Sequence, residues 1–450
     1  MRTDLAARYG DERLPRYTSY PTAPHFSAAV GYRDYAAWLE EVEEGLTGSL
    51  YLHVPFCRAM CWYCGCNTTV ARRDGPVMDF LDLLRREVAL VAERLPRRLE
   101  VRHVHFGGGT PTILPADAFR NLVDLLRERF ALAAGAELAI EIDPRHLSAG
   151  MAAALGAAGV TRASLGVQSF DPEVQAAINR RQSVTQTVVA AERLRAAGVT
   201  GLNVDLLYGL PLQTVAACVE TVRACLPLRP DRFSVFGYAH VPGFKKHQQK
   251  IRTEDLPDGP VRHAQAEAIA AMLEEAGYRR IGMDHFALPA DPMARAHEAG
   301  LLRRNFQGYT TDDADALLGF GPSAIGRLPQ GYVQNDPVRG RYARRIAAGL
   351  PATARGIRIS REDRCRAVVI ERLMCDFEVD LGQVCRAHGT RPDTLLRAAD
   401  RLPALQADGV VRLQGERISI APDARFLVRN VAAAFDSHLA AAADRHSRAV

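Results

Sequence analysis

Three cysteines with close spacing stand out in the segment YLHVPFCRAMCWYCGCN, residues 51–67. Cys57, Cys61 and Cys64 are separated by three and then two residues, and Cys66 follows after one more. The preceding run, 49–55, is apolar and ends in proline, which predicts a strand that stops just before the cysteines. Thiolates on one loop can converge on a soft metal centre. Three thiolates on a four-iron cluster would leave one iron open, as a reductive cleavage reaction needs.

Two other metal sites compete with this interpretation. A structural zinc site usually has two separated pairs of ligands, and this chain has no second pair. A cluster with four thiolates, using Cys66 as well, is the commoner iron–sulfur arrangement. Disulfides are not expected, because nine cysteines is an odd number and no secretory signal precedes them. We expect the other five to be buried packing residues: Cys218, Cys225, Cys365, Cys375 and Cys385.

Bulk composition narrows the class of protein. A chain of 450 residues suggests two or three domains, and 48% hydrophobic residues is ordinary for a soluble protein. No apolar stretch is long enough to span a bilayer, and MRTDLAARYG lacks the apolar core of a signal peptide, so we predict a cytoplasmic protein. The net charge is only +5, which does not indicate a nucleic-acid partner. Only Lys245, Lys246 and Lys250 are lysines; the many arginines fit a coding bias, and some could bind carboxylates.

Strand-like and helical segments alternate from residue 49 onwards, which predicts βα units and a parallel sheet. The predicted strands lie near 49–55, 101–107, 138–143, 161–168, 201–208 and 232–239, and helices near 76–94, 116–131, 183–196 and 213–227. Each crossover should be right-handed.

The strand faces locate the site. In 138–143, Ile140 and Ile142 share one face while Glu141 and Asp143 share the other. In 203–207, Val204 and Leu206 likewise oppose Asn203 and Asp205. The strands of a sheet that is covered on both sides would be apolar along their whole length. This polar face therefore indicates the interior of a barrel near its C-terminal mouth. Six βα units rather than eight predict an incomplete, open barrel.

The flanking regions complete the predicted organisation. Residues 1–48 are interpreted as an N-terminal arm with a short helix near 32–44, and 49–340 as the barrel with its extension. The segment 341–358 is predicted to be a linker, and 359–450 a mainly helical domain. In that last domain, helices at 361–375, 391–402 and 423–441 with a hairpin at 408–413 and 417–421 suggest a winged-helix-like module. It has no concentrated basic helix, so we expect it to cap or pack rather than to bind DNA.

The cysteine pattern resembles that of the radical S-adenosylmethionine (SAM) superfamily, and the longer form resembles the family of oxygen-independent coproporphyrinogen III oxidases. That likeness covers nearly the whole chain. It extends over RYTSYPT at 16–22, GGGTPT at 107–112, EIDPR at 141–145, GVQSF at 166–170, DLLYGLP at 205–211, GMDHFA at 282–287, RNFQGYTT at 304–311 and Arg429-Asn430. The resemblance implies an α/β fold, an incomplete (β/α)6 radical SAM barrel. It also implies anaerobic oxidative decarboxylation of coproporphyrinogen III to protoporphyrinogen IX, driven by a radical generated from SAM.

The resemblance also implies the ligands. Cys57, Cys61 and Cys64 would hold a [4Fe-4S] cluster, and two SAM molecules would bind. The first SAM would contact Tyr51, Gly108, Glu141 and Ile325, and the second Tyr63, Gly109, Thr110, Gln168, Arg180, Asp205 and Ala239. The family often has phenylalanine where this chain has Tyr63, which keeps an aromatic face. No catalytic acid or base is assigned.

Simpler interpretations exist for several of these residues. GGGTPT lacks the Lys-Ser/Thr pair of a phosphate loop and could be a plain tight turn, while the resemblance implies a bed for the methionine end of SAM. Glu141 and Asp205 could form salt bridges in the mouth, and Arg180 could cap a helix. We expect His53 and His105 to support neighbouring residues rather than to react.

The resemblance further implies a porphyrinogen substrate, a flavodoxin- or ferredoxin-type electron donor and a monomer. A haem chaperone of the same family and a radical SAM methyltransferase that opens haem remain alternatives. Relatives that carry haem lack the equivalent of Cys66 and the RYTSYPT arm, which this chain has. Arg16 is our first candidate for anchoring unreacted propionates, with Tyr17 and Tyr20 against the macrocycle. Equally, RYTSYPT could simply strap the arm to the barrel.

Overall fold

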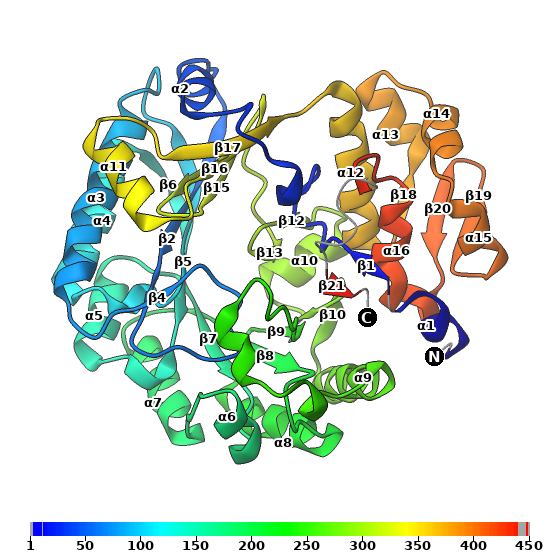
Figure 1. Cartoon of the computed structure of the whole chain (residues 1–450), viewed down its shortest axis with the longest axis horizontal. Coiled ribbons are helices and arrows are strands. Elements are labelled where there is room, and N and C mark those ends of the chain that lie inside the picture. The colour runs from blue at the N-terminus through cyan, green and yellow to red at the C-terminus, as the bar shows by residue number, and fades with distance from the viewer. Residues whose placement is uncertain (1–2, 11, 440–446, 449–450) are drawn as a thin grey trace. The chain divides into compact units, whose positions relative to one another are not determined.

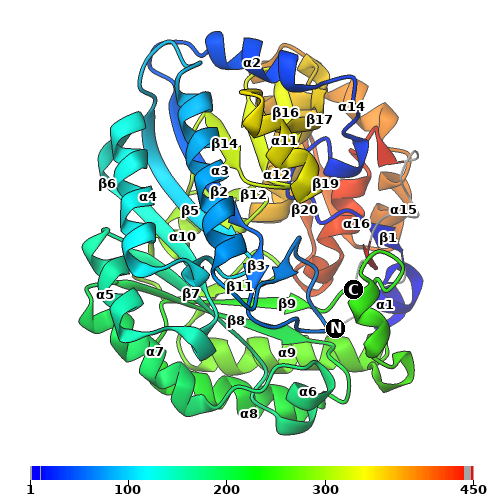
Figure 2. The ribbon, with the colours of Figure 1, turned by 60° about the vertical axis from the view of Figure 1, so that its left-hand side comes forward.

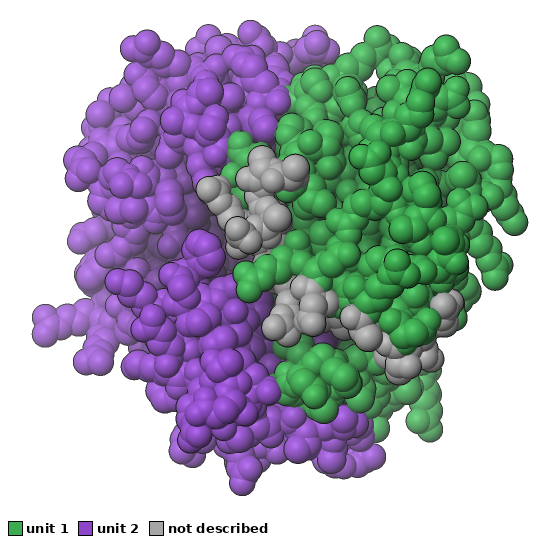
Figure 3. All heavy atoms as spheres, turned by 45° about the vertical axis from the view of Figure 1, so that its right-hand side comes forward, with its two compact units in different colours: residues 1–25, 257–311, 359–450 green, residues 26–256, 312–358 purple. Residues whose placement is uncertain are grey.

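The computed structural model describes residues 3–10, 12–439 and 447–448. The chain divides into two compact units, coloured separately in Figure 3. Unit 1 comprises 1–25, 257–311 and 359–450, and unit 2 comprises 26–256 and 312–358. Every residue predicted to bind the cluster or SAM falls in unit 2. The domain limits predicted from the sequence stay predictions, because a compact unit need not be an independently folding domain.

A parallel sheet forms the centre of unit 2. Its strands follow the order β9-β8-β7-β6-β5-β2-β14-β15-β16-β17, and β14 through β9 run parallel while β15–β17 are antiparallel additions. The strands are β2 (Thr47–Val54), β5 (Glu100–Gly108), β6 (Ala131–Ile142), β7 (Arg162–Gln168), β8 (Gly201–Tyr208), β9 (Arg232–Gly237), β14 (Ala316–Phe320), β15 (Ile325–Leu328), β16 (Gly331–Asn335) and β17 (Thr353–Arg358). The six predicted βα strands and the parallel arrangement are confirmed.

Strand β14 is a seventh parallel strand that the sequence analysis missed. All five of its residues are buried, so it shows neither alternation nor helical periodicity. A short apolar run of this kind cannot be assigned from its pattern alone. Strand β14 pairs with β2, with Leu318 opposite Leu50. The turn that follows β14 therefore lies beside the end of β2, just before the cysteines.

Helices lie outside the strands of unit 2 (Figures 1 and 2). They are α2 (Tyr32–Glu40), α3 (Gly75–Ala92), α4 (Ala116–Arg129), α5 (Ala149–Ala157), α6 (Pro172–Ala177), α7 (Val184–Ala196), α8 (Val215–Cys225) and α11 (Arg339–Ala347). Helix α7 begins in a capping box, in which Ser183 accepts from the Gln186 N–H and the Gln186 side chain accepts from the Ser183 N–H. Single turns of 3₁₀ helix complete the unit: η2 (Pro111–Ile113), η3 (Pro144–His146), η4 (Leu226–Leu228), η5 (Lys246–Lys250) and η6 (Thr253–Asp255).

The segment predicted as a linker, 341–358, is instead part of unit 2. It forms most of α11 and all of β17, which pairs with β16. Its glycines and arginines suggested flexibility, but Tyr342 and Ile346 are buried on one face of α11. Tertiary packing therefore overrides composition here.

Unit 1 holds the C-terminal helices and a small sheet, β18-β20-β19. Its elements are α1 (Thr3–Tyr9), β1 (Arg13–Leu14), η1 (Ala23–His25), α9 (Gly259–Glu275), β10 (Arg279–Ile281), β11 (His285–Ala287), α10 (Pro292–Glu298), β12 (Arg303–Asn305), β13 (Gly308–Thr310), α12 (Arg361–Asp376), β18 (Glu378–Asp380), α13 (Leu381–His388), α14 (Pro392–Ala398), α15 (Leu402–Ala407), β19 (Val411–Gln414), β20 (Arg417–Ile420), η7 (Pro422–Leu427), α16 (Val428–Ala433) and β21 (Ser447–Arg448). The predicted hairpin is confirmed as β19–β20. The single helix predicted at 423–441 is wrong: it divides into η7 and α16, and its last two residues lie outside the described residues.

Two aromatic residues of RYTSYPT are core residues of unit 1. Tyr17 and Tyr20 are 3% and 4% exposed and join the cluster formed by α12 and α16. The Tyr17 hydroxyl donates to Asp436 Oδ2 at 3.1 Å, and the Tyr20 hydroxyl lies 2.9 Å from Ser437 Oγ. The expectation that these rings pack against a macrocycle is therefore wrong, and within unit 1 the segment straps the N-terminal residues to the C-terminal helices. None of the helices in the described ranges is both long and apolar enough to cross a membrane.

Candidate functional site

Residues 55–70, which we call the cysteine loop, begin where β2 ends, at the C-terminal edge of the parallel sheet. After β2, the two-residue strand β3 (Phe56–Cys57) pairs with β4 (Thr69–Val70), so the loop closes on itself. The glycine-rich end of β5 holds it in place, since the Gly109 N–H donates to Val54 O at 2.8 Å and the Thr110 N–H to Phe56 O at 2.8 Å. A Cβ at Gly109 would lie 2.4 Å from Phe56 O. Only glycine permits this approach.

Each of the three cysteines has a different polar environment. Cys57 Sγ lies 3.4 Å from both Thr110 Oγ1 and Thr68 Oγ1. Cys61 is buried, and its sulfur accepts from Arg180 Nη1 at 3.5 Å and Arg145 Nη2 at 3.7 Å. Cys64 Sγ accepts from the Cys66 N–H at 3.4 Å. Hydroxyl, guanidinium and backbone donors all favour thiolate over thiol.

The thiol pKa values separate Cys64 from its neighbours. A hydrogen bond from the Cys66 thiol lowers the pKa of Cys64 to about 7, helped by the charges of Lys245 and Arg180. The contact with Cys64 and burial both raise the pKa of Cys66. Burial raises the pKa of Cys57, and Cys61 and Cys64 are close enough to add to that effect. Cys66 is thus a hydrogen-bond partner of Cys64 in this structure.

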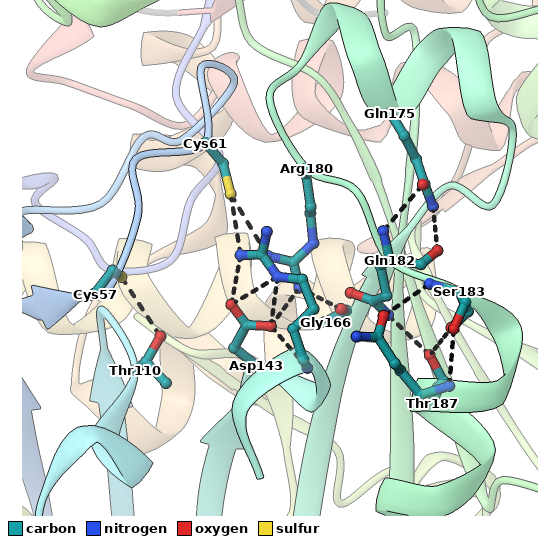
Figure 4. A network of polar contacts seen from close by, with 12 residues as sticks. Cys57, Cys61, Thr110, Asp143, Gly166, Gln175, Arg180, Gln182, Ser183 and Thr187 are labelled. Atoms are coloured by element: carbon teal, nitrogen blue, oxygen red, sulfur yellow. Dashed lines mark hydrogen bonds and ion pairs between the residues drawn. The ribbon is translucent and has the colours of Figure 1, made fainter.

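Arg180 joins the cysteine loop to the ends of β6 and β7. Its Nη2 donates to Gly166 O at 2.5 Å and to Asp143 Oδ1 at 3.5 Å, and Figure 4 shows Cys61, Asp143 and Arg180 turned toward one another. Burial alone would raise the pKa of Asp143, but hydrogen bonds from Arg145 and the charge of Arg180 hold it at about 2. Burial opposes the charge of Arg180, yet Tyr63, Asp143 and Cys61 raise its pKa, so it remains a cation. The buried Arg180 Nε has no hydrogen-bond partner. The main contacts of Arg180 are therefore to Cys61, Asp143 and Gly166, and not to a helix end as the cap considered from the sequence would require.

Glu141 faces the glycines of β5. Its Oε2 accepts from the Gly108 N–H at 3.1 Å and its Oε1 from His105 Nε2 at 3.2 Å. Burial would raise the pKa of Glu141, but these bonds outweigh it and the pKa is lowered. His53 donates from Nε2 to Asn67 O at 2.8 Å, which leaves Nδ1 to accept from the Tyr51 hydroxyl at 3.0 Å. Both histidines thus support neighbouring residues in this structure.

Asp205 lies on the polar face that the strand pattern predicted. Its Oδ2 accepts from Ser164 Oγ at 2.6 Å and its Oδ1 from Asn203 Nδ2 at 2.7 Å. Burial raises the pKa of Asp205 above its usual range. These residues come from β7 and β8, which confirms that the polar positions of the two strands share one face.

The other predicted SAM contacts occupy the same unit. Gln168 ends β7 with a left-handed φ of 69°. Tyr63 lies on the cysteine loop, packed against the cluster that contains Val174 and Tyr238. Ala239 follows β9, and its carbonyl accepts from Gln248 Nε2 at 3.3 Å. Ile325 begins β15, just after the turn that follows β14.

Sequence reasoning missed part of this arrangement. Arg145 makes several bonds to Asp143, with Nη2 to Oδ2 at 2.5 Å, and also reaches Cys61. EIDPR carries both residues, and an Asp-Pro-Arg turn after a strand could have suggested a local pair. Contacts from η5 to the cysteine loop join segments nearly 200 residues apart, and no local pattern predicts them.

The residues present fit a multi-iron cluster and SAM. Within the described ranges, no three His, Cys, Asp or Glu side chains converge closely enough for a single metal ion. A four-iron cluster is larger than an ion and is held by thiolates. Gly108 packs closely against the His53 ring, which a Cβ at this position would approach to 2.8 Å. The unpartnered Arg180 Nε offers a donor for a carboxylate.

The chain is similar to known proteins both in sequence and in structure. The family model described as the radical SAM superfamily matches residues 51–225, and the model described as the HemN C-terminal domain matches 359–427. A protein of Bradyrhizobium diazoefficiens named oxygen-independent coproporphyrinogen III oxidase is 60% identical over 450 residues, all of both chains. A protein of Paracoccus denitrificans with the same name is 44% identical over 98% of this chain and 97% of its own.

A solved structure resembles the fold of the whole chain. Coproporphyrinogen III oxidase from Escherichia coli, described as a radical SAM enzyme, superposes with a TM-score of 0.90 and 38% identity. The match covers 94% of this chain and 98% of the other. The predicted radical SAM barrel with its helical C-terminal region is confirmed by this likeness.

Proposed function

This chain belongs to the family of oxygen-independent coproporphyrinogen III oxidases, and we propose that it converts coproporphyrinogen III to protoporphyrinogen IX. Two propionate side chains become vinyl groups, each with loss of carbon dioxide, one hydrogen atom and one electron. The observation that carries the proposal is the cysteine loop, closed against the arginine and carboxylate residues at the C-terminal edge of the sheet. The family likeness extends over the full chain.

Cys57, Cys61 and Cys64 are the proposed ligands of a [4Fe-4S] cluster. When bound, the cluster and SAM together supply one-electron reduction and abstraction of a hydrogen atom from carbon. Around them the chain provides fixed donors: Thr68 on Cys57, Arg145 and Arg180 on Cys61. Hydrogen bonds to ligating sulfurs are one means by which a protein sets a cluster's potential.

We assign SAM binding to the predicted residues, in two groups of contacts. Glu141, kept ionised by His105 and Gly108, can accept a bond from an ammonium or hydroxyl group. Arg180 can donate from its unpartnered Nε to a carboxylate while Asp143 and Gly166 fix its other end. Asp205, fixed by Ser164 and Asn203, can accept from a ribose hydroxyl. Two bound SAM molecules per chain remain a proposal, and equilibrium dialysis of the reconstituted protein tests it.

Three further features belong to the proposal. The electron donor is a flavodoxin- or ferredoxin-type protein, the enzyme acts as a monomer, and it works in the cytoplasm, where thiols stay reduced. All nine cysteines are free in the structure. Light scattering of the purified protein tests the monomer, and cell fractionation tests the compartment.

Anaerobic reconstitution followed by product analysis tests the function. We expect protoporphyrinogen IX, two equivalents of carbon dioxide, methionine and 5′-deoxyadenosine from coproporphyrinogen III, SAM and a reductant. Stoichiometric haem binding without conversion of coproporphyrinogen would instead identify a haem chaperone. A linear tetrapyrrole formed from haem would identify a haem-opening methyltransferase.

A further inference from the structure

All the lysines of this chain lie in one short segment. Lys245, Lys246 and Lys250 fall within nine residues that also include Arg252 and contain no Asp or Glu, residues 244–252. We call these nine residues the lysine segment. A chain that uses arginine for 54 of its 57 basic residues concentrates its few ammonium groups at one place. Composition alone cannot produce that clustering, so its position in the fold matters.

The lysine segment packs directly on the cysteine loop. Gln248 Nε2 donates to Tyr63 O at 2.9 Å, His247 Nε2 to Cys64 O at 2.7 Å, and Lys245 Nζ to Cys66 O at 3.0 Å. Gln248 is fully buried and also bonds to the Val241 N–H at 2.6 Å. These carbonyls belong to the part of the loop that carries Cys64. The segment is therefore fixed over the proposed cluster ligands by three separate side chains.

Apart from Ile251, which is buried, the remaining side chains of the lysine segment are solvent-exposed. Phe244 is 74% exposed, the largest value among the large hydrophobic residues that the structure describes as exposed. Lys246 and Lys250 are also exposed, and the Lys250 ammonium lies 5.4 Å from the Trp62 ring centroid. An exposed aromatic ring among positive charges is unusual for a solvated surface. Positive charge around one aromatic ring is complementary to an acidic protein surface.

We propose that the lysine segment is the docking surface of an acidic one-electron carrier protein, with Phe244 as its apolar contact. The inference rests on the proposed function, because only a reduced cluster beneath the loop gives such docking a purpose. In this step the carrier loses one electron and the cluster gains it, and no bond forms or breaks. The carrier's redox group would approach over the Cys64–Cys66 side of the loop.

Electrostatics favours a transient complex at this surface. Complementary charge raises association rates by about 10- to 1,000-fold at low ionic strength, and salt screens the effect. Electron-transfer encounters bury little surface. A few ammonium groups and one aromatic ring are therefore sufficient. Rapid release matters as much as binding, because each turnover requires more than one electron.

The main test is flavodoxin binding to a charge-reversed variant. The probe is an acidic bacterial flavodoxin, titrated by calorimetry against the reconstituted protein. We choose Lys246→Glu/Lys250→Glu, since Lys245 contacts the loop backbone and its loss could disturb the cluster. The dissociation constant should rise by about tenfold at low salt, and its dependence on salt should flatten.

A matched control carries the same change in charge elsewhere on unit 2. Arg97→Glu/Arg223→Glu replaces two exposed arginines, one just before β5 and one in the last turn of α8, which leads to β9. Both positions lie toward the N-terminal ends of the strands, opposite the cysteine loop. We expect flavodoxin affinity within about twofold of the unmodified protein, since distant exposed charges are screened.

The variant Phe244→Ser distinguishes the apolar contact from the electrostatic attraction between the two proteins. It should weaken flavodoxin binding several-fold while leaving the salt dependence unchanged, as aromatic anchors act after encounter. If both Phe244→Ser and the double lysine variant bind flavodoxin as tightly as the unmodified protein does, the proposal is overturned. A raised KM for coproporphyrinogen with unchanged flavodoxin affinity would assign the lysines to the substrate instead, and would also overturn it.

Reduction by dithionite distinguishes this inference from the proposed function. With dithionite as electron source, SAM cleavage should be equal in all three variants, whereas with reduced flavodoxin only the lysine and Phe244 variants should slow. If dithionite drives no SAM cleavage in the unmodified protein, the proposed function fails. The calorimetric comparison would still decide the docking surface.

Discussion

Glu87 and Glu141, both in unit 2, are two glutamates with opposite environments. Glu87, in the middle of α3, is 2% exposed and accepts from the Gly321 N–H, the Tyr342 hydroxyl and Asn335 Nδ2, each at 2.7 Å. Burial raises its pKa to about 7 despite these bonds. Glu141 has a side chain that is 39% exposed, a histidine partner and a lowered pKa.

The difference shows how this unit separates packing from binding. The donors to Glu87 come from three segments of unit 2, and both carboxylate oxygens are satisfied, so this network ties α3 to β16 and α11. The network at the sheet edge is incomplete, because Arg180 keeps an unpartnered Nε beside Asp143 and Cys61. A charged network with an open donor is suited to a ligand, and a saturated one to stability.

The largest expected effect comes from replacing a proposed cluster ligand in the open network. Cys61→Ser should lose the cluster, whereas Cys66→Ser should keep about four irons per chain. The reason is that the Cys66 N–H donates to Cys64 Sγ, which makes Cys66 a partner of a proposed ligand. Iron and sulfide analysis after anaerobic reconstitution measures both. Loss of iron in Cys66→Ser would show that the cluster uses four cysteines and contradict the open site.

Arg180→Gln should remove one ligand contact while the fold survives. Asp143 keeps its bonds to Arg145, so no uncompensated buried carboxylate remains. We expect one of the two proposed SAM molecules to be lost and decarboxylation to fall about 100-fold, as for loss of a preorganised charged donor. Equilibrium dialysis counts the SAM, and iron analysis checks that the cluster is intact. Unchanged stoichiometry would mean that Arg180 serves the cysteine loop alone.

The pH dependence of stability distinguishes the two networks. Glu87 has a folded pKa of about 7 against a reference of 4.5, so its raised pKa favours folding fully below pH 4.5. That contribution is lost as pH rises through 7, roughly 3 kcal/mol in all. Asp143, with a pKa of about 2, adds no change in this window. The stability of Glu87→Gln relative to the unmodified protein should therefore increase between pH 5 and pH 8.

Urea unfolding at the two pH values measures that gain. Asp143→Asn serves as the comparison, and its stability difference should be the same at pH 5 and pH 8. A constant difference for Glu87→Gln as well would show that Glu87 is ionised at both pH values, and the contrast between the networks would disappear.

The smallest expected effect removes one donor from Glu87. Tyr342→Phe keeps the ring that packs against Phe80 and deletes only the hydroxyl bond. We expect a loss of about 1 kcal/mol at pH 8, where the carboxylate is charged, and less at pH 5. A double-mutant cycle with Glu87→Gln isolates the pair. Zero coupling at pH 8 would indicate that the hydroxyl finds an equivalent partner.

Local sequence patterns were sufficient for most elements and for the position of the site. CxxxCxxC after an apolar strand placed the thiols at a strand end, and Glu141 and Asp205 appeared on the polar face by the period of two alone. These features depend on residues close together in the chain. They need no knowledge of distant partners.

Only the tertiary structure decided which distant groups meet. Strand β14 carries no periodicity, 341–358 packs into the sheet, and Tyr17 and Tyr20 are buried beside α12 and α16. The bonds from the lysine segment to Tyr63, Cys64 and Cys66 span nearly 200 residues. Burial and hydrogen-bond partners depend on long-range packing, and that packing places the lysine segment over the cysteine loop.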